Sequence, residues 1–219
     1  VLAVAVLVLP VAGEPARSIA PVLLAVALGV QLITVAIVQT GIEAPYGQAV
    51  SLRDNHRKVS VGRPNSTLRL SNGFGAYLAD AAEVANRVGF ARGTPMLDLT
   101  GRSPSTLYTM GARSTSQAWV IGGYRGSNNL AAAMMKRVSC DELSRAWLLT
   151  QPVGTTNISP EILSGFGASL KTDYEIVGTV VMSESFSGYR EHWTQHLLKP
   201  TREADAARAA CVAARSGNT

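Results

Sequence analysis

Two short segments combine glycine, a hydroxyl side chain and an arginine just before an expected helix. The first runs from Asp98 to Ser103 and the second from Gly122 to Ser127. Backbone N–H groups at a helix N-terminus, together with the helix dipole, favour a phosphate or another anion. The candidate ligand-binding residues are therefore Asp98, Arg102, Ser103, Tyr124, Arg125 and Ser127. The alternative is two ordinary strand-to-helix loops with good N-caps, because neither segment has the GxGxxG or GxxxxGKS pattern.

Two further patterns bear on catalysis and on metal binding. Asp98 follows an apolar run, so it is a candidate general base, ribose ligand or partner of Arg102, although capping and ion pairing are the commoner roles. His192 and His196 have i, i+4 spacing, and on a helix two such histidines can bind the same metal ion. The Ser/Gly-rich segment before them favours an extended chain instead. Because no third ligand and no GxSxG motif is present, we predict no metal or cofactor and assign no catalytic residue.

An alternation of strands and helices has to position these residues. Strands are expected at 95–100, 118–121, 146–150 and 174–182. Helices are expected after Ser103–Pro104, from 128 to 137, after the Ser139–Glu142 capping box and after Ser159–Pro160. Such an alternation predicts an α/β domain with three layers and a mostly parallel sheet of about four strands. Ligands bind beyond the carboxyl ends of such strands, where both candidate segments and Thr150–Gln151 fall.

The flanks of this region have simpler patterns. Residues 41–72 carry short alternating runs that indicate strands or extended connections. An apolar stripe predicts a helix from 74 to 88, capped by Ser71 or Asn72 and ended by Gly89. Residues 197–200 close the sheet region, and residues 201–215 form an Ala/Arg-rich helix that carries Cys211.

The N-terminal 40 residues have a different composition from the rest. Between Arg17 and Glu43 lie 25 consecutive uncharged residues, and a helix of about 20 apolar residues crosses a bilayer. A buried core helix is the alternative, but soluble helices of this length rarely lack charges on every face. We therefore predict transmembrane segments in residues 1–40, with 1–12 as the remainder of an earlier span, and a soluble domain in 41–219.

Composition excludes some classes of protein. The chain has 219 residues, of which 47% are hydrophobic and 16% charged, so it is not a disordered tail. Its net charge of +5 comes mostly from scattered arginine, so no nucleic-acid partner is predicted. A basic patch that faces anionic lipid headgroups remains an alternative for a tethered domain.

Charge and cysteine content leave two questions open. Arg17 places the domain outside the cytoplasm, whereas Arg53, Arg57 and Lys58 favour the opposite orientation. Cys140 and Cys211 are the two cysteines, and from composition they are either a disulfide or two buried thiols.

Several runs resemble a known class of membrane protein. They are residues 97–104, 110–113, 117–124 and 146–149. Together they resemble the C-terminal part of multi-pass bacterial inner-membrane proteins similar to GT-C-type glycosyltransferases, and the likeness covers most of residues 19–219. The resemblance implies a periplasmic domain, which favours the disulfide, and a polyprenyl-phosphate sugar donor. It transfers no catalytic residue, because the catalytic acid of that class lies in an early extracytoplasmic loop with no counterpart here.

Three hypotheses follow. In the first, the chain is the C-terminal end of a polytopic inner-membrane protein whose periplasmic domain supports sugar transfer from a polyprenyl-phosphate donor in envelope glycan assembly. In the second, it is a non-catalytic, membrane-anchored module that binds envelope polysaccharide or a partner protein. The third is a cytoplasm-facing domain that binds a nucleotide at its strand-to-helix loops.

Overall fold

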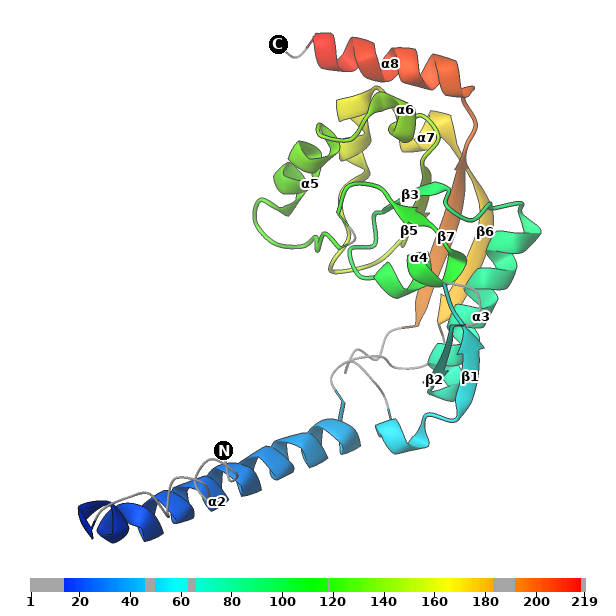
Figure 1. Ribbon diagram of the computed structural model, residues 1–219. Coiled ribbons are helices and arrows are strands. Elements are labelled where there is room, and N and C mark those ends of the chain that lie inside the picture. The colour runs from blue at the N-terminus through cyan, green and yellow to red at the C-terminus, as the bar shows by residue number, and fades with distance from the viewer. Residues whose placement is uncertain (1–13, 46–49, 63–65, 118, 183–191, 218–219) are drawn as a thin grey trace.

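The computed structural model describes residues 14–45, 50–62, 66–117, 119–182 and 192–217, with side chains from residue 21 onward. A long N-terminal helix projects from a mixed α/β domain (Figure 1). The expected remnant of an earlier span, residues 1–12, lies outside the described residues.

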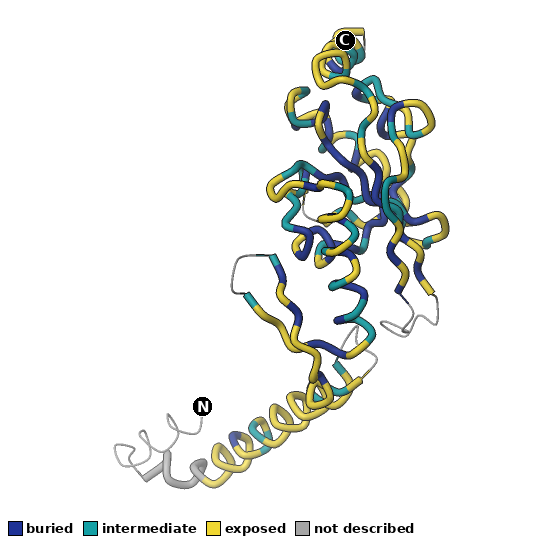
Figure 2. The backbone as a smooth tube through the Cα atoms, turned by 90° about the vertical axis from the view of Figure 1, so that its right-hand side faces the viewer, coloured by how far each residue is buried: buried dark blue, intermediate teal, exposed yellow. Residues whose placement is uncertain are grey.

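Helix α2, Glu14–Glu43, stands apart from the domain. Pro21 lies within it, near the N-terminal end of the apolar stretch Pro21–Glu43, which is long and apolar enough to cross a membrane. In this stretch only Ala27 is buried, as the nearly continuous exposed surface in Figure 2 shows. A core helix would bury one face, so packing against the described residues does not explain the uncharged sequence of α2.

A small ribbon follows the helix. The 3-10 turn η2, Leu52–Asp54, leads into strands β1, Arg57–Ser60, and β2, Thr67–Leu70, which pair antiparallel. Helix α3, Asn72–Arg87, then begins at Ser71, whose Oγ accepts a hydrogen bond from the N–H of Phe74 at 3.2 Å. The predicted helix of residues 74–88 and its Ser71 cap are therefore present.

The main sheet is mixed rather than mostly parallel. Its five strands lie in the order β4-β3-β5-β7-β6. Strand β3 is parallel to β4 and β5, whereas β7 is antiparallel to both β5 and β6. The strands are β3, Pro95–Asp98; β4, Arg113–Ser114; β5, Trp147–Thr150; β6, Tyr174–Met182; and β7, Trp193–Pro200.

The prediction of a mostly parallel, four-stranded sheet was wrong for a physical reason. Only ten residues separate β6 from β7, and a parallel crossover needs about a dozen or more. The two strands therefore return as an antiparallel pair. Residues 197–200, predicted to close the sheet region, are the second half of β7, a strand that was not predicted.

The predicted strand at 118–121 was also wrong. Residue 118 lies outside the described residues, and residues 119–121 have no regular secondary structure. The chain pairs with β3 earlier, because Gly111 turns it in the left-handed conformation (φ 73°) and Thr115 N–H then donates to Met96 O at 2.8 Å. The apolar residues Trp119 and Ile121 are exposed instead of entering the sheet.

Helices cover both faces of the sheet. They are α4, Pro104–Met110; α5, Ser127–Met135; α6, Cys140–Leu143; α7, Leu170–Asp173; α8, Ala204–Ser216; and the 3-10 helix η3, Pro160–Phe166. Ser139 caps α6 by accepting from Glu142 N–H at 3.2 Å, as the capping-box pattern predicts.

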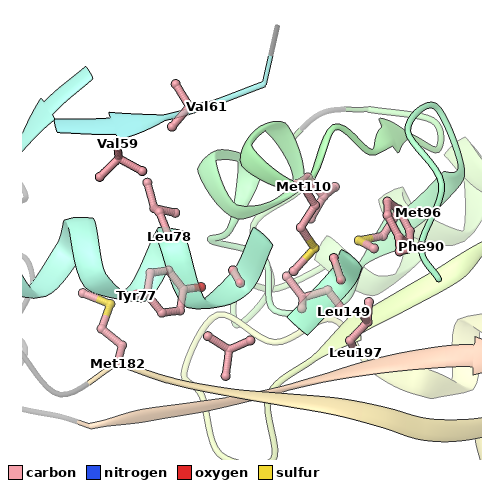
Figure 3. Close-up of a cluster of buried hydrophobic side chains, with 14 of the residues drawn as sticks. Val59, Val61, Tyr77, Leu78, Phe90, Met96, Met110, Leu149, Met182 and Leu197 are labelled. Atoms are coloured by element: carbon pink, nitrogen blue, oxygen red, sulfur yellow. The ribbon is translucent and has the colours of Figure 1, made fainter. Parts of the chain in front are cut away.

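Adjacent residues of each central strand point to opposite faces, which produces two cores. Met96, Leu149 and Leu197 pack with α3 and α4, and Figure 3 shows them facing Tyr77 and Leu78. Their neighbours Leu97, Leu148 and Leu198 pack on the other face with η3, α5 and α8. The result is a three-layer domain whose central strands are apolar on both sides.

Candidate functional site

Three loops meet at the edge of the sheet where β3 and β5 end. They are residues 99–103, 119–126 and 151–158. The indole N–H of Trp119 donates to Gly101 O at 3.0 Å, Gly122 N–H donates to Thr156 O at 2.9 Å, and Ile158 N–H donates to Leu99 O at 2.9 Å. Backbone contacts therefore join the two candidate anion-binding segments through the third loop.

The glycines in these loops have a structural role. A Cβ on Gly101 would lie 2.0 Å from Thr156 O, and a Cβ on Gly122 would lie 2.0 Å from Asn157 O. Only glycine allows the backbones to approach this closely. The glycine-rich composition that suggested a phosphate cradle is thus explained by loop packing.

Asp98 serves as an internal acceptor. Its Oδ1 accepts from the N–H of Thr100 at 2.8 Å and lies 2.7 Å from the Thr100 hydroxyl, and its Oδ2 accepts from Ser103 N–H at 3.0 Å. Burial raises the pKa of Asp98, although these donors favour the ionised form and limit the rise.

Asp98 should make the stability of the domain pH-dependent. Because its folded pKa lies above the ordinary value of 3.8, the folded chain binds this proton more tightly than the unfolded chain. The Asp98 contribution to the free energy of unfolding therefore falls as pH rises from 3.8 through the folded pKa, and is constant above it. Denaturant unfolding between pH 4 and neutrality should show this decline in the wild type and not in Asp98→Asn. Asp80→Asn, at an exposed position of α3, is the control; equal slopes in all three proteins would contradict the assignment.

Arg102 does not pair with Asp98 through any hydrogen bond or ion pair found among the described residues. Its Nε donates to Thr156 Oγ1 at 2.8 Å and its Nη2 to Thr155 Oγ1 at 3.1 Å. The guanidinium carbon also lies 4.5 Å from the centre of the Trp193 ring, a cation–π contact. Arg102 thus ties the 99–103 loop to the 151–158 loop and to β7.

A buried polar network lies beneath these loops, and the sequence analysis missed it. Gln195 accepts a hydrogen bond from the hydroxyl of Tyr77 and donates to Ser103 Oγ at 2.7 Å; its Nε2 also lies 3.4 Å from Gln151 Oε1. The Tyr77 hydroxyl lies 2.7 Å from Thr106 Oγ1. Burial raises the pKa of Tyr77 far above its ordinary value, so the phenol remains a proton donor. One sequence feature could have indicated this network. Gln195 alternates with the apolar residues Trp193 and Leu197, so in a strand its side chain points into the core with theirs.

The second candidate group lies apart from this network. Tyr124 and Arg125 are exposed, and Ser127 hydroxyl donates to Tyr124 O at 2.6 Å rather than capping α5. Asp98 and Ser103 point into the network described above. The six candidate residues therefore do not form one anion-binding site.

A cleft of about 560 Å³ opens beside the end of β5, and it is the main candidate ligand site. Its volume lies in the range of small-molecule sites. Most of its lining is apolar, contributed by Leu99, Pro152, Ile158, Pro160, Leu170, Ile176 and Leu198. The cleft lies between the β5-β7-β6 side of the sheet and the segment that contains η3 and α7. Thr150, Gln151 and the candidate metal ligand His196 line it, whereas none of the six candidate anion-binding residues is among its described lining residues.

The cleft also has polar lining residues, among them Gln151, Asn157 and Ser159. Lys171 supplies a cation, Asn128 and Thr150 supply neutral groups, and His196 has its Nδ1 3.0 Å from Thr179 Oγ1. Burial, with a smaller contribution from the charge of Asp173, raises the pKa of Tyr174 to about 12, so its hydroxyl stays a neutral donor. None of the described residues that line the cleft is an Asp or a Glu. The arrangement suits a ligand with an apolar body and a neutral or anionic polar end.

The paired histidines do not form a metal site. His196 lies in strand β7 and His192 immediately precedes it, so the two do not share a helical face. Among the described residues, no group of three or more His, Cys, Asp or Glu side chains is placed to hold a metal ion.

Comparison with known proteins assigns no family. No protein-family model matches the chain. No curated protein and no solved structure matches it either. Function is therefore inferred from the geometry of the molecule.

Proposed function

We propose that this chain is a membrane-anchored, extracytoplasmic binding module that holds a polyprenyl-linked phosphate or sugar during envelope glycan assembly. In this proposal the domain supports sugar transfer by binding the polyprenyl-linked donor. The bond between the sugar and its phosphate is broken at another site. The proposal joins three features: an apolar helix whose surface is largely exposed, a disulfide within the domain, and an apolar cleft with a cation at its rim.

The observation that carries the proposal is the bare surface of α2. Its 23-residue stretch Pro21–Glu43 is apolar on every side, and only Ala27 is buried. Exposing such a surface to water is unfavourable at roughly 25 cal/mol per Å² of apolar area, whereas lipid removes this cost. A lipid bilayer is therefore the partner that best accounts for the helix.

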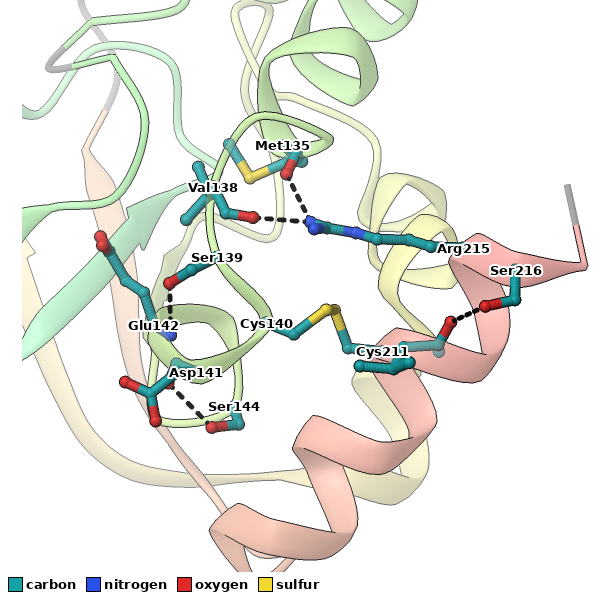
Figure 4. The surroundings of a disulfide bond; sticks show 12 residues. Met135, Val138, Ser139, Cys140, Asp141, Glu142, Ser144, Cys211, Arg215 and Ser216 are labelled. Atoms are coloured by element: carbon teal, nitrogen blue, oxygen red, sulfur yellow. Dashed lines mark hydrogen bonds between the residues drawn. A yellow bond between two sulfur atoms is a disulfide. The ribbon is translucent and has the colours of Figure 1, made fainter. Parts of the chain in front are cut away.

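The disulfide supports an extracytoplasmic location. Cys140 in α6 is bonded to Cys211 in α8, and Figure 4 shows the bond between the two elements. Disulfides persist in oxidising compartments and are rare in the cytoplasm. The resemblance to GT-C-type glycosyltransferases points to the same side of the membrane.

The cleft supports a lipid-linked anion as ligand. Its apolar lining suits a prenyl chain, and Lys171 at the exposed rim suits a phosphate. The absence of carboxylates from its lining avoids repulsion of that phosphate. The specific choice of a polyprenyl carrier comes from the resemblance described above.

Two linked experiments test this function. In the first, the expressed chain should sediment with membranes, resist extraction by alkaline carbonate and be released by detergent. Recovery of a soluble chain that lacks residues 21–43 would identify α2 as a removable leader and reject the anchor.

In the second, the detergent-purified chain should bind farnesyl phosphate, a short prenyl phosphate, more tightly than farnesol. Lys171→Ala should weaken farnesyl phosphate binding about fivefold, the effect of losing one exposed charge contact, and leave farnesol binding unchanged. Lys58→Ala, at an exposed position of β1, is the matched control. Equal loss in both variants, or no saturable binding, would reject the cleft as the phosphate site.

A further inference from the structure

An exposed aromatic loop lies beside the cleft, and the proposed binding function does not explain it. We define the aromatic loop as residues 119–125. Trp119 is 59% exposed and Tyr124 is 72% exposed, and Ile121 between them is also exposed. Val153, 83% exposed, lies on the neighbouring loop. Single exposed apolar residues are common, but several within one short loop, two of them aromatic, indicate a contact surface.

The loop is held in place rather than loosely folded. The Trp119 indole N–H is bound to Gly101 O, and Gly122 N–H is bound to Thr156 O. A Cβ on Gly123 would lie 2.0 Å from Thr155 O, so the backbone is packed against the 151–158 loop. These contacts hold the Trp119 ring with much of its surface in solvent, although burial of the ring would be the favoured state in water.

The sequence that contains the loop is basic. From Leu99 to Cys140 the chain contains five basic residues and no acidic one, although Arg113 is ion-paired with Glu142. Arg125 is exposed within the loop itself. Basic residues at a membrane surface are attracted by anionic headgroups, and tryptophan and tyrosine prefer the interfacial zone. Aromatic rings and an exposed arginine in one loop therefore match an anionic lipid surface.

The domain is held close to the end of the proposed anchor. Eight residues separate Glu43, the last residue of α2, from Leu52, the first of η2. Ser51 hydroxyl donates to Ile42 O at 3.1 Å, so the N-cap residue of η2 lies against the end of the helix. In Figure 1, helix α5 and the loop before it lie on the side of the domain toward which α2 extends. A bilayer around α2 is thus within reach of this side.

We propose that the aromatic loop docks on the anionic lipid surface, with Trp119 and Tyr124 at headgroup level. This inference rests on the proposed membrane anchor. The loop packs on residues 154–157, and Pro152 and Asn157 of the same segment line the cleft. Docking therefore places the cleft mouth at the bilayer surface, where a membrane-borne prenyl phosphate enters without leaving the lipid.

Tryptophan fluorescence tests the docking directly. The chain has three tryptophans; Trp147 and Trp193 are buried, and Trp119 is the exposed one. The full chain is reconstituted in nanodiscs of phosphatidylcholine and phosphatidylglycerol whose acyl chains are brominated close to the headgroup. Brominated lipid should quench roughly one third of the emission, because one ring of three reaches the interface. Trp119→Phe should remove this quenching.

Lipid charge provides a second readout. Quenching of the wild type should decrease when phosphatidylglycerol is replaced by phosphatidylcholine, and Arg125→Ala should lower it in the anionic discs. Wild-type quenching equal to that of Trp119→Phe, in chains that co-elute with the nanodisc, would overturn the docking. Failure of the chain to enter the nanodisc would instead reject the anchor of the proposed function, so the two failures are distinguishable.

Discussion

Replacing Gln195 by leucine should lower the free energy of unfolding of the domain by about 3 kcal/mol. Gln195 has no exposed surface, and its amide connects Tyr77, Ser103 and Gln151. Leucine has a similar size but no polar atoms, so the Tyr77 hydroxyl loses an acceptor and Ser103 loses a donor. The Tyr77 hydroxyl keeps Thr106 Oγ1 and Ser103 Oγ keeps the Thr100 hydroxyl as partners, so the cost is that of two lost hydrogen bonds at up to about 1.5 kcal/mol each.

The neighbouring strand position supplies the control. Thr194 is exposed on β7, so Thr194→Val should change the free energy of unfolding by less than about 0.5 kcal/mol. Tyr77→Phe combined with Gln195→Leu should cost less than the sum of the single changes, because both partners of one hydrogen bond are then apolar. Denaturant unfolding of the four variants in detergent measures these differences. Strict additivity, or a Gln195→Leu cost no larger than that of Thr194→Val, would show that the network is not energetically coupled.

Most helices of this domain were predictable because their signals are local, whereas the short α7 was not predicted. Ser103 and Pro104 precede α4 and Gly111 ends it; the Ser139 capping box begins α6. Each signal works through contacts within a few residues, which a sequence displays directly. The exposed apolar surface of α2 was predictable for the same reason. That its residues are uncharged on every face can be read from the sequence without knowledge of the tertiary structure.

The sheet order was less predictable because strand pairing is non-local. Strand β7 lies between β5 and β6. His196 of β7 pairs with Thr150 of β5 as well as with Thr179 of β6, and no local pattern displays the pairing with β5. Residues 118–121 had the apolar composition of a buried strand. Composition does not distinguish burial in a sheet from exposure to another apolar surface, and Trp119 and Ile121 are exposed.

In the candidate site, too, local features were predictable and non-local contacts were not. The sequence placed three loops at one edge of the sheet, and these loops meet there. It did not reveal that Gly101 and Gly122 serve close backbone packing, because the atoms they approach belong to residues 156 and 157. The cleft and the Gln195 network were also hidden, since they combine residues separated by up to 118 positions along the chain.

Removing the disulfide should have the largest effect on the stability of the domain. Cys140 and Cys211 are 71 residues apart, and on the chain-entropy model such a cross-link stabilises a protein by about 4 kcal/mol. Replacement of both cysteines by serine should therefore lower the free energy of unfolding by about that amount. The loss exceeds that expected for Gln195→Leu, because it releases α8 from the rest of the domain as well as enlarging the unfolded ensemble.

A second contact between α8 and the rest of the domain allows the release of α8 to be separated from the effect on the unfolded ensemble. Arg215 donates to Met135 O at 2.9 Å and to Val138 O at 2.8 Å, next to the disulfide (Figure 4). Arg215→Ala alone should cost roughly 1–2 kcal/mol, because the cross-link still holds α8 near its site. In the double-serine variant the same change should free α8, seen as new protease cleavage after Arg208.

The same cysteine pair reports the compartment. In intact cells a membrane-impermeant maleimide should label the chain only after reduction, because the bonded thiols are unavailable until the disulfide is broken and the domain faces outward. Cysteines that label without reductant would be free thiols, and the 4 kcal/mol effect should then be absent. Cysteines that stay unlabelled in intact cells after reduction, but react once the membrane is permeabilised, would place the domain in the cytoplasm. Stability and labelling thus test one bond by independent measurements, and the extracytoplasmic assignment requires both results.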